Sequence, residues 1–448
     1  MAPRGRSLRW LAVAMLAVLS PLTAITVPQV AAQDPVELSM WLDVTDGPDT
    51  ADCIERVAVE SYNALGNGST VKVTQQANSW DATKTALAGG AGPDLVGTPG
   101  PSFAMQLALA GQLAPLDDAA AEFGWDAIFA PNSLNLGRVD GKLYAIPSEI
   151  ETLVLYYNKT LFEENGWTPP TTIDEMMTLS QTIADAGIIP FAHVNAEWRP
   201  ANEWFVGEFL NHGAGPEMVY KALIGEVPWT DPAFVAPMET LATMQKNGWF
   251  SGGLDRYYTG TFAEAGAMFG EGEAAMKIEG TWFISGAGDF FGEEAGNANE
   301  LGWVPTPSTD GTVSYTLGIG QTYSVNANSE HPKEAAQFLG YYFSPAIQAA
   351  LLSECGLANA PVDLSKEDLS GVDPMLAEIN ASLNEAYAAN NYGYTTWTFW
   401  PPESETYLIE EVEKVWAGDV TVEDYLAGHQ AKFDAEREAG AAPPVPAR

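Results

Sequence analysis

Apolar and polar positions in the first quarter of the chain switch between two periods. Three short segments alternate as strands do, at 36–42, 70–74 and 94–96. Three longer segments between and after them repeat with the period of a helix, at 49–65, 80–88 and 102–109. Regular alternation of strand and helix is typical of a mainly parallel, doubly wound sheet. We therefore predict an α/β fold that binds its ligand beyond the carboxyl ends of the strands.

The middle and end of the chain are richer in helical patterns. Two close strands are predicted at 143–147 and 152–157. A helix follows between Gly166 and Gly187, where Thr172 is the expected N-cap and Glu175 the capping-box acid. Helical segments are predicted from there to about residue 280, at 332–351, and through the C-terminal third. The exceptions are a return to strand at 316–325 and an aromatic, irregular stretch at 391–402.

The return to strand late in the chain suggests that it crosses between two lobes more than once. A chain of 448 residues is long enough for about two domains. We predict discontinuous lobes, with 36–150 and 320–370 forming lobe I and 153–315 and 373–438 forming lobe II. The Pro- and Ala-rich residues 441–448 are predicted to be a disordered tail.

The first 32 residues have the organisation of a signal peptide. Arg4, Arg6 and Arg9 precede an apolar run at 10–19, and Val30-Ala31-Ala32 provides the small residues of a cleavage site. The run is too short to span a bilayer. No cysteine precedes Cys53, so we expect a soluble, exported protein without a lipid anchor, in the periplasm or outside the cell.

Charge and residue content narrow the range of ligands. Loss of residues 1–32 removes three arginines and no acid, which changes the formal charge from −39 to −42. Such a surface repels phosphate backbones and anionic lipids, so nucleic acid is not an expected partner. The four His are scattered and no CxxC motif is present, so we predict neither a metal nor a cofactor.

Five blocks of sequence, in a fixed order, carry a resemblance to a known family. They are 92–96 with 111–116 (GPDLV, GQLAPL), 141–147 (GKLYAIP), 155–171 beginning LYYNK, 272–282 (GEAAM to GTW), and Gly318 with Asn326 and 332–338. Together they resemble the extracellular solute-binding proteins of ATP-driven sugar importers, the maltose-binding type among them. The resemblance implies two α/β lobes of the type II-like periplasmic binding-protein fold, joined by a hinge. The 155–157 strand and the Gly318 region are the expected crossings.

The same resemblance implies what the protein does. A family member of this type is not an enzyme: it binds a mono- or oligosaccharide in the interlobe cleft and delivers it, as a monomer, to the permease subunits of an ABC importer. Pyranose faces pack on aromatic rings while hydroxyls need polar partners, and 14 Trp are present. The predicted ligand-binding residues are Trp41, Asp43, Trp80, Thr98, Ser102, Glu151, Asn195, Glu197, Trp198, Trp204, Trp282, Gly318, Trp397 and Trp400.

Three other readings of the residues stay open at this point. Glu149 and Glu151 face the same way in a strand, and a glycoside hydrolase needs two such carboxylates. Tyrosine pairs at 156–157, 257–258 and 341–342 suggest ferric iron, although adjacent strand residues point to opposite faces. The strongly acidic charge favours a cationic or polar solute such as a polyamine or an opine, which would be recognised by acids.

The chain has two cysteines, Cys53 and Cys355. An exported chain with two cysteines and no metal motif most simply pairs them. The resemblance places both in lobe I, where a disulfide would leave hinge motion free. Two unrelated buried thiols are the alternative.

Overall fold

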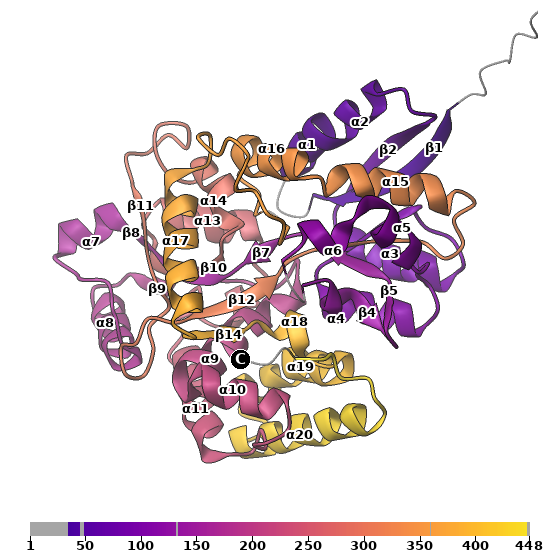
Figure 1. Cartoon of the computed structure of the whole chain (residues 1–448). Coiled ribbons are helices and arrows are strands. Elements are labelled where there is room, and N and C mark those ends of the chain that lie inside the picture. Colours follow the sequence, from indigo (N-terminus) through magenta and orange to yellow (C-terminus); the bar gives the residue numbers. More distant parts are fainter. Residues whose placement is uncertain (1–34, 45–48, 131–132, 359, 446–448) are drawn as a thin grey trace, which may run out of the picture. The chain divides into compact units, whose positions relative to one another are not determined.

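The N-terminal part of the chain, coloured indigo in Figure 1, forms most of a mixed sheet of five strands. The computed structural model describes residues 35–44, 49–130, 133–358 and 360–445, so the predicted signal peptide lies outside the described residues. The sheet has the strand order β2 (Ser69–Gln76), β1 (Val36–Asp43), β3 (Leu95–Thr98), β13 (Thr322–Val325), β6 (Ala145–Pro147). The first three strands run parallel, as predicted, whereas β13 is antiparallel to both of its neighbours.

The predicted helices beside this sheet are confirmed, with one correction. The segment 49–65 forms a continuous helical run made of α1 (Asp49–Ile54), a π-helical turn (Glu55–Glu60) and α2 (Ser61–Ala64), and α3 (Ser79–Ala88) and α4 (Pro101–Leu109) follow their strands. The helical segment predicted at 332–351 is confirmed, but it divides into two helices, α15 (Pro332–Tyr342) and α16 (Pro345–Cys355). Pro345 has no N–H to donate and disfavours a helical conformation at Ser344, where α15 cannot continue.

A second sheet has the order β11 (Leu301–Val304), β8 (Leu153–Asn158), β10 (Ala274–Gly280), β9 (Ile189–Phe191). The prediction of helical segments alone up to about residue 280 is wrong at β9 and β10. Every residue of β10 is buried, so the strand has no alternation of apolar and polar positions. Its Ala, Met, Lys and Glu residues favour helix locally, and pairing with β8 and β9 overrides that preference.

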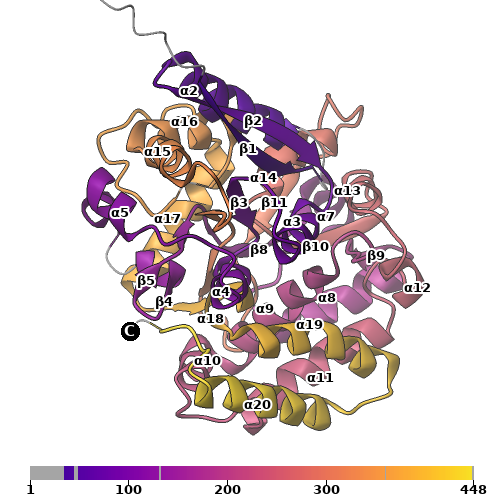
Figure 2. The same ribbon diagram turned by 90° about the vertical axis from the view of Figure 1, so that its right-hand side faces the viewer.

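Helices make up most of the remaining structure. The predicted capping box of Thr172 and Glu175 is confirmed at the start of α8 (Ile173–Asp185). α9 (Asn202–Ala214) packs on α11 (Pro232–Lys246), and α19 (Pro402–Ala417) packs along α20 (Val422–Glu438) (Figure 2). The other helices are α5 (Asp117–Phe123), α6 (Trp125–Ile128), α7 (Lys159–Asn165), α10 (Pro216–Leu223), α12 (Leu254–Tyr257), α13 (Phe262–Gly270), α14 (Phe283–Gly286), α17 (Pro374–Ala388) and α18 (Thr396–Phe399). A short hairpin joins β4 (Arg138–Val139) and β5 (Lys142–Leu143).

A small third sheet joins the two larger ones. Its order is β14 (Tyr392–Tyr394), β12 (Tyr315–Ile319), β7 (Ile150–Glu151), and Gly318 pairs with Glu151. Along the chain β7 links β6 to β8, and β12 leads directly into β13. The crossings therefore lie at β7 and at the end of β12, whereas the 155–157 segment that we expected to cross is an interior part of β8. The predicted lobe boundaries remain a prediction.

The C-terminal tail departs from the prediction of disorder. Residues 441–445 are described and Pro443 is buried, because the segment packs back on the protein, where it shares a hollow with Met105 and Arg138. Residues 446–448 lie outside the described residues. None of the described helices is long and apolar enough to cross a membrane.

The predicted disulfide is confirmed. Cys53 at the end of α1 and Cys355 at the end of α16 are bonded, with their Cα atoms 5.8 Å apart. The two helices pack against each other. Arg56 forms a 2.8 Å ion pair with Glu354 beside the bond. The pairing joins positions 302 residues apart within neighbouring helices.

Candidate functional site

Three of the predicted tryptophans come together next to the chain crossings. The ring centroids of Trp204 and Trp282 are 5.4 Å apart, and those of Trp282 and Trp397 are 6.3 Å apart. They come from α9, from the turn after β10, and from α18. We call these three residues the indole cluster. Trp282 is half-buried, whereas Trp204 and Trp397 are largely buried.

Glu151 lies beside this cluster on β7. Burial raises the pKa of Glu151 well above its ordinary value, the nearby Glu149 raises it further, and the neighbouring Trp397 indole opposes the rise. Glu203 and Glu279 also raise it. A side chain at Gly320 would overlap the Glu151 carboxyl, since a Cβ there would lie 2.0 Å from Oε2. The absence of a side chain at Gly320 therefore leaves the space that the Glu151 carboxyl occupies.

Glu279 holds the central indole of the cluster. Trp282 Nε1 donates a 2.9 Å hydrogen bond to Glu279 Oε1, and Lys277 Nζ lies 2.9 Å from Oε2. Burial raises the pKa of the Glu279 carboxyl, and Lys277 opposes the rise most strongly. The buried ion pair therefore supplies a fixed acceptor for the indole N–H.

A second group of rings joins α3 and α4 to the loop before α9. Trp80 and Phe103 lie on α3 and α4, and their ring centroids are 5.5 Å and 6.2 Å from that of Trp198. α4 also contacts the residue that follows α18, where Ser102 Oγ donates a 2.9 Å hydrogen bond to the Trp400 carbonyl. The predicted residues Trp80 and Trp198 therefore meet in space, whereas Ser102 contacts Trp400.

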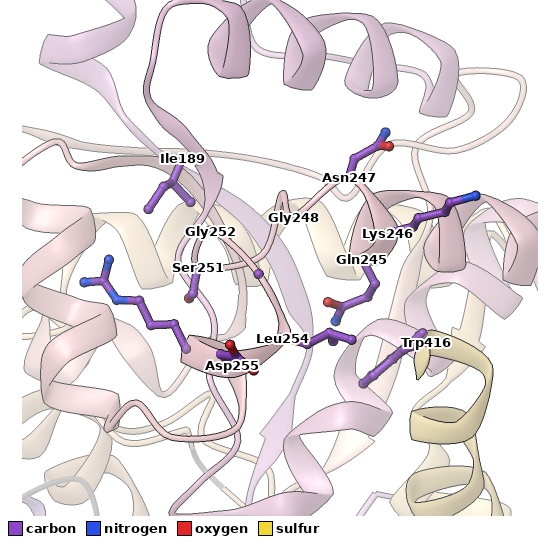
Figure 3. A pocket seen from close by; sticks show the side chains of 12 residues that line it. Ile189, Gln245, Lys246, Asn247, Gly248, Ser251, Gly252, Leu254, Asp255 and Trp416 are labelled. Atoms are coloured by element: carbon purple, nitrogen blue, oxygen red, sulfur yellow. The ribbon is translucent and has the colours of Figure 1, made fainter. Parts of the chain in front are cut away.

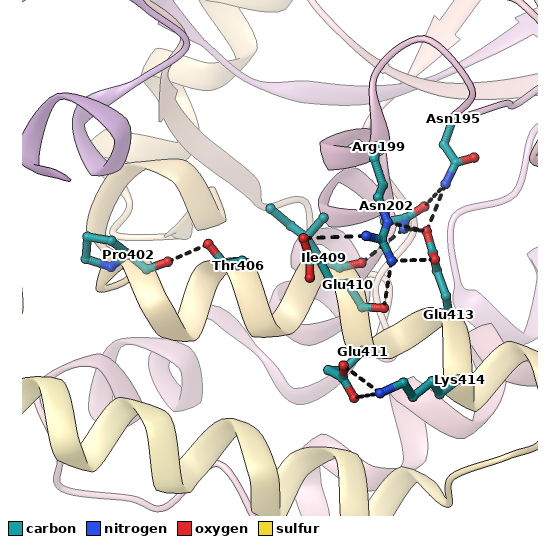
Figure 4. A network of polar contacts seen from close by, with 10 residues as sticks. All are labelled: Asn195, Arg199, Asn202, Pro402, Thr406, Ile409, Glu410, Glu411, Glu413 and Lys414. Atoms are coloured by element: carbon teal, nitrogen blue, oxygen red, sulfur yellow. Dashed lines mark hydrogen bonds and ion pairs between the residues drawn. The ribbon is translucent and has the colours of Figure 1, made fainter. Parts of the chain in front are cut away.

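Asn195 belongs to a polar network (Figure 4). Its Nδ2 donates to Asn202 Oδ1 at 3.0 Å and to Glu413 Oε1 at 3.2 Å. Arg199 Nη2 lies 2.7 Å from Glu413 Oε2, and Tyr257 donates to Asn202 at 2.8 Å. The network fastens the loop that carries Glu197 and Trp198 to α19. The Asn195 amide therefore helps to hold this loop in position through its bonds to Asn202 and Glu413.

Other predicted residues have internal partners as well. Thr98 is buried, with its Oγ1 2.6 Å from Thr322 Oγ1. Asp43 accepts a 2.6 Å hydrogen bond from the Ser79 N–H at the start of the helix bearing Trp80. Glu197 accepts one of 2.6 Å from the Phe262 N–H. Trp41 is half-buried in β1.

Trp400 was predicted to bind ligand, but it packs inside the protein. Its side chain is fully buried, and its ring lies 5.2 Å from that of Trp229. Gly318, in contrast, lies where any side chain would crowd both Glu151 and Thr395, with a Cβ 3.1 Å from Glu151 Cγ. Because Gly318 has no side chain, Glu151 and Thr395 can both pack against it at the crossing.

Sequence reasoning missed Glu279, Glu203, Glu405 and Phe103. Glu279 stands three residues before Trp282 and lies near the end of β10, a strand that was not predicted. Glu203 and Glu405 are buried on α9 and α19, and their carboxyls interact directly. In the sequence they are two acids among 59. Phe103 follows Ser102 and reads as an ordinary apolar residue of a helix.

A family comparison decides the class of the protein. The family model of the bacterial extracellular solute-binding proteins matches residues 57–371. The chain belongs to this family. This solute-binding protein is 22% identical over 333 residues to a probable sugar-binding periplasmic protein of Rhizobium meliloti, covering 73% of this chain and 76% of that one. It is 27% identical over 263 residues to the galactooligosaccharide-binding protein of Bacillus subtilis, covering 56% of each. The matches to these curated relatives thus span 76% and 56% of the relatives' own lengths.

Solved structures confirm the predicted two-lobed fold. A chitin oligosaccharide binding protein matches with a TM-score of 0.75 and 22% identity, over 90% of this chain and 99% of that one. The maltose-bound MalE3 protein of T. maritima matches with a TM-score of 0.71 and 20% identity, over 89% and 99%. At these identities the likeness establishes the fold of the solute-binding protein.

Proposed function

We propose that the protein binds a mono- or oligosaccharide at the indole cluster, without catalysis, and passes it to the permease subunits of an ABC importer. The observation that carries this proposal is the meeting of Trp204, Trp282 and Trp397 with the buried carboxyls of Glu151 and Glu279 beside the crossings. Apolar ring faces with a few fixed polar groups are the surroundings that a sugar requires. Relatives named as sugar-binding proteins support the same substrate class.

Because most of the cluster is buried, a ligand reaches it when the two parts of the protein move apart. Motion about β7 and the end of β12 opens the contacts of Trp198 and Ser102 and exposes the cluster, and closure over the ligand excludes water. We further propose that the protein is exported, loses residues 1–32, carries no lipid anchor and acts as a monomer.

Thermal unfolding measured with a panel of sugars tests the proposal. A ligand that binds only the folded protein stabilises it by RT ln(1 + [L]/Kd), so the melting temperature rises with its concentration. We expect a rise with at least one saccharide and none with putrescine, spermidine or octopine. A rise with these three compounds alone, or the release of shorter sugars from a bound saccharide, would overturn the proposal.

A further inference from the structure

A hollow of about 790 Å³ shares no lining residue with the indole cluster, and Figure 3 shows the side chains that line it. It is lined by Ile189 of β9, by residues 245–248 at and after the end of α11, by residues 251–256 at and before the start of α12, and by Trp416 near the end of α19. None of the residues predicted to bind ligand lines it. The hollow is therefore a separate feature of the protein.

Two polar side chains in its wall have hydrogen-bonding atoms without a protein partner. Gln245 is 2% exposed and Trp416 is 5% exposed. Neither the Nε2 nor the Oε1 of Gln245, nor the Nε1 of Trp416, has a partner among the described residues. Figure 3 shows the Gln245 amide turned toward Leu254, with Trp416 beyond it. A buried polar group left unpaired costs about 1–3 kcal/mol, so native proteins leave few of them.

The loop that forms the opposite wall is held in place. Ser251, Gly252 and Gly253 have φ values of +50°, +84° and +138°, of which the first is costly for a residue with a Cβ. The Ser251 N–H donates to the Phe191 carbonyl at 2.8 Å, and its hydroxyl accepts from the His193 N–H at 3.0 Å. These bonds fix the wall to Phe191 of β9 and to His193, two residues beyond it.

The chemistry of the lining selects a neutral ligand. Arg256 is paired with Glu273 at 2.6 Å, and Asp255 and Lys246 add one charge of each sign. The inner groups are one amide carbonyl, one amide NH₂ and one indole N–H, with Ile189 and Leu254 as apolar neighbours. Two adjacent hydroxyls match this set, since each both donates and accepts.

We propose that this hollow is a second binding site, which takes a pair of neighbouring hydroxyl groups of a sugar ring through Gln245 and Trp416. Because both groups are nearly covered, the ligand displaces Leu254 on entry. The site does not depend on the proposed function of the indole cluster, as it uses other residues.

NMR of the full chain labelled with ¹⁵N at tryptophan tests this site. The spectrum of the indole groups separates signals from the 14 Trp, and Trp416→Phe and Trp282→Phe identify two of them. We expect methyl α-D-glucopyranoside to shift the Trp416 signal in a saturable way. Gln245→Leu should weaken that response about three- to tenfold, while Gln181→Leu, on the exposed face of α8, should leave it unchanged. Gln245→Met replaces Gln245→Leu if the leucine variant does not fold.

Three results would overturn the proposal. The first is a Trp416 signal that does not respond to the glucoside, which would leave solvent as the partner of Gln245. The second is a response to N-acetylglycine N-methylamide alone, which would indicate an amide site. The third is loss of the Trp416 response in Trp282→Ala, which would mean that the signal comes from the indole cluster. A silent Trp282 signal with a responding Trp416 would show that the glucoside binds in the hollow and not at the indole cluster.

Discussion

The indole of Trp282 is tied to Glu279 by a 2.9 Å hydrogen bond, and Lys277 neutralises the same carboxylate. The ring most central to the indole cluster is therefore oriented by a buried ion pair. If it packs on a sugar, Trp282→Ala should weaken sugar binding by more than ~1 kcal/mol and leave unfolding cooperative. Calorimetry measures the change. Trp167→Ala, which removes a half-buried indole elsewhere, should bind as the wild type does, and an unchanged Kd for Trp282→Ala would exclude the contact.

Gly280 provides a test of ring position. A Cβ at Gly280 would lie 1.9 Å from Cζ3 of Trp282, so Gly280→Ala must displace the indole. We expect a loss of sugar affinity close to that of Trp282→Ala, with the ring still present and its fluorescence altered. The matched control is Gly286→Ala, where a Cβ meets no atom within 4 Å. Equal affinities for the two glycine variants would show that the orientation of Trp282 does not matter.

Glu151 is the predicted acceptor for ligand hydroxyls. Removal of a buried hydrogen-bonding partner costs about 1–3 kcal/mol, so Glu151→Ala should bind sugar about fivefold to a hundredfold more weakly. Glu151→Gln, which keeps an acceptor oxygen, should recover part of the loss. Chromatography of the bound sugar provides the decisive control: hydrolysis by the wild type that disappears in Glu151→Gln would identify an enzyme.

The disulfide should contribute to stability. In the chain-entropy model a crosslink over 302 positions stabilises the fold by roughly 5 kcal/mol, and removing a native disulfide typically costs about 2–5 kcal/mol. Replacing Cys53 and Cys355 together with alanine should lower the melting temperature without a change in sugar Kd. Alkylation of the unfolded, unreduced protein followed by mass measurement checks the bond, and two added alkyl groups would disprove it.

Glu203 should make stability depend on pH. Burial raises the pKa of Glu203 to about 8 from 4.5, and its carboxyl interacts with that of Glu405, whose pKa is also raised. A raised carboxyl pKa stabilises the fold most below 4.5, and the contribution is lost as pH rises through 8. Glu203→Gln should therefore raise the melting temperature more at pH 8 than at pH 5. An equal effect at both pH values would mean that Glu203 is ionised in the folded protein.

Local sequence determined much of the fold. The period of apolar positions identified β1 to β3 and the helices that follow them, and the capping box of Thr172 and Glu175 fixed the start of α8. Such signals depend on residues a few positions apart, so the sequence contains them in full. The pairing of Cys53 with Cys355 also followed without coordinates, since only two cysteines were present.

The direction in which side chains point was decided only by the tertiary structure. β10 has no alternating pattern because both of its faces are buried, so its pairing with β8 was invisible. Trp397 and Trp400 are three residues apart in one aromatic segment, yet one joins the indole cluster and the other packs on Trp229. Long-range packing sets these directions, and the partners of Trp282 and Trp400 come from distant parts of the chain. The sequence therefore determined which residue types were available, and the fold determined which of them meet.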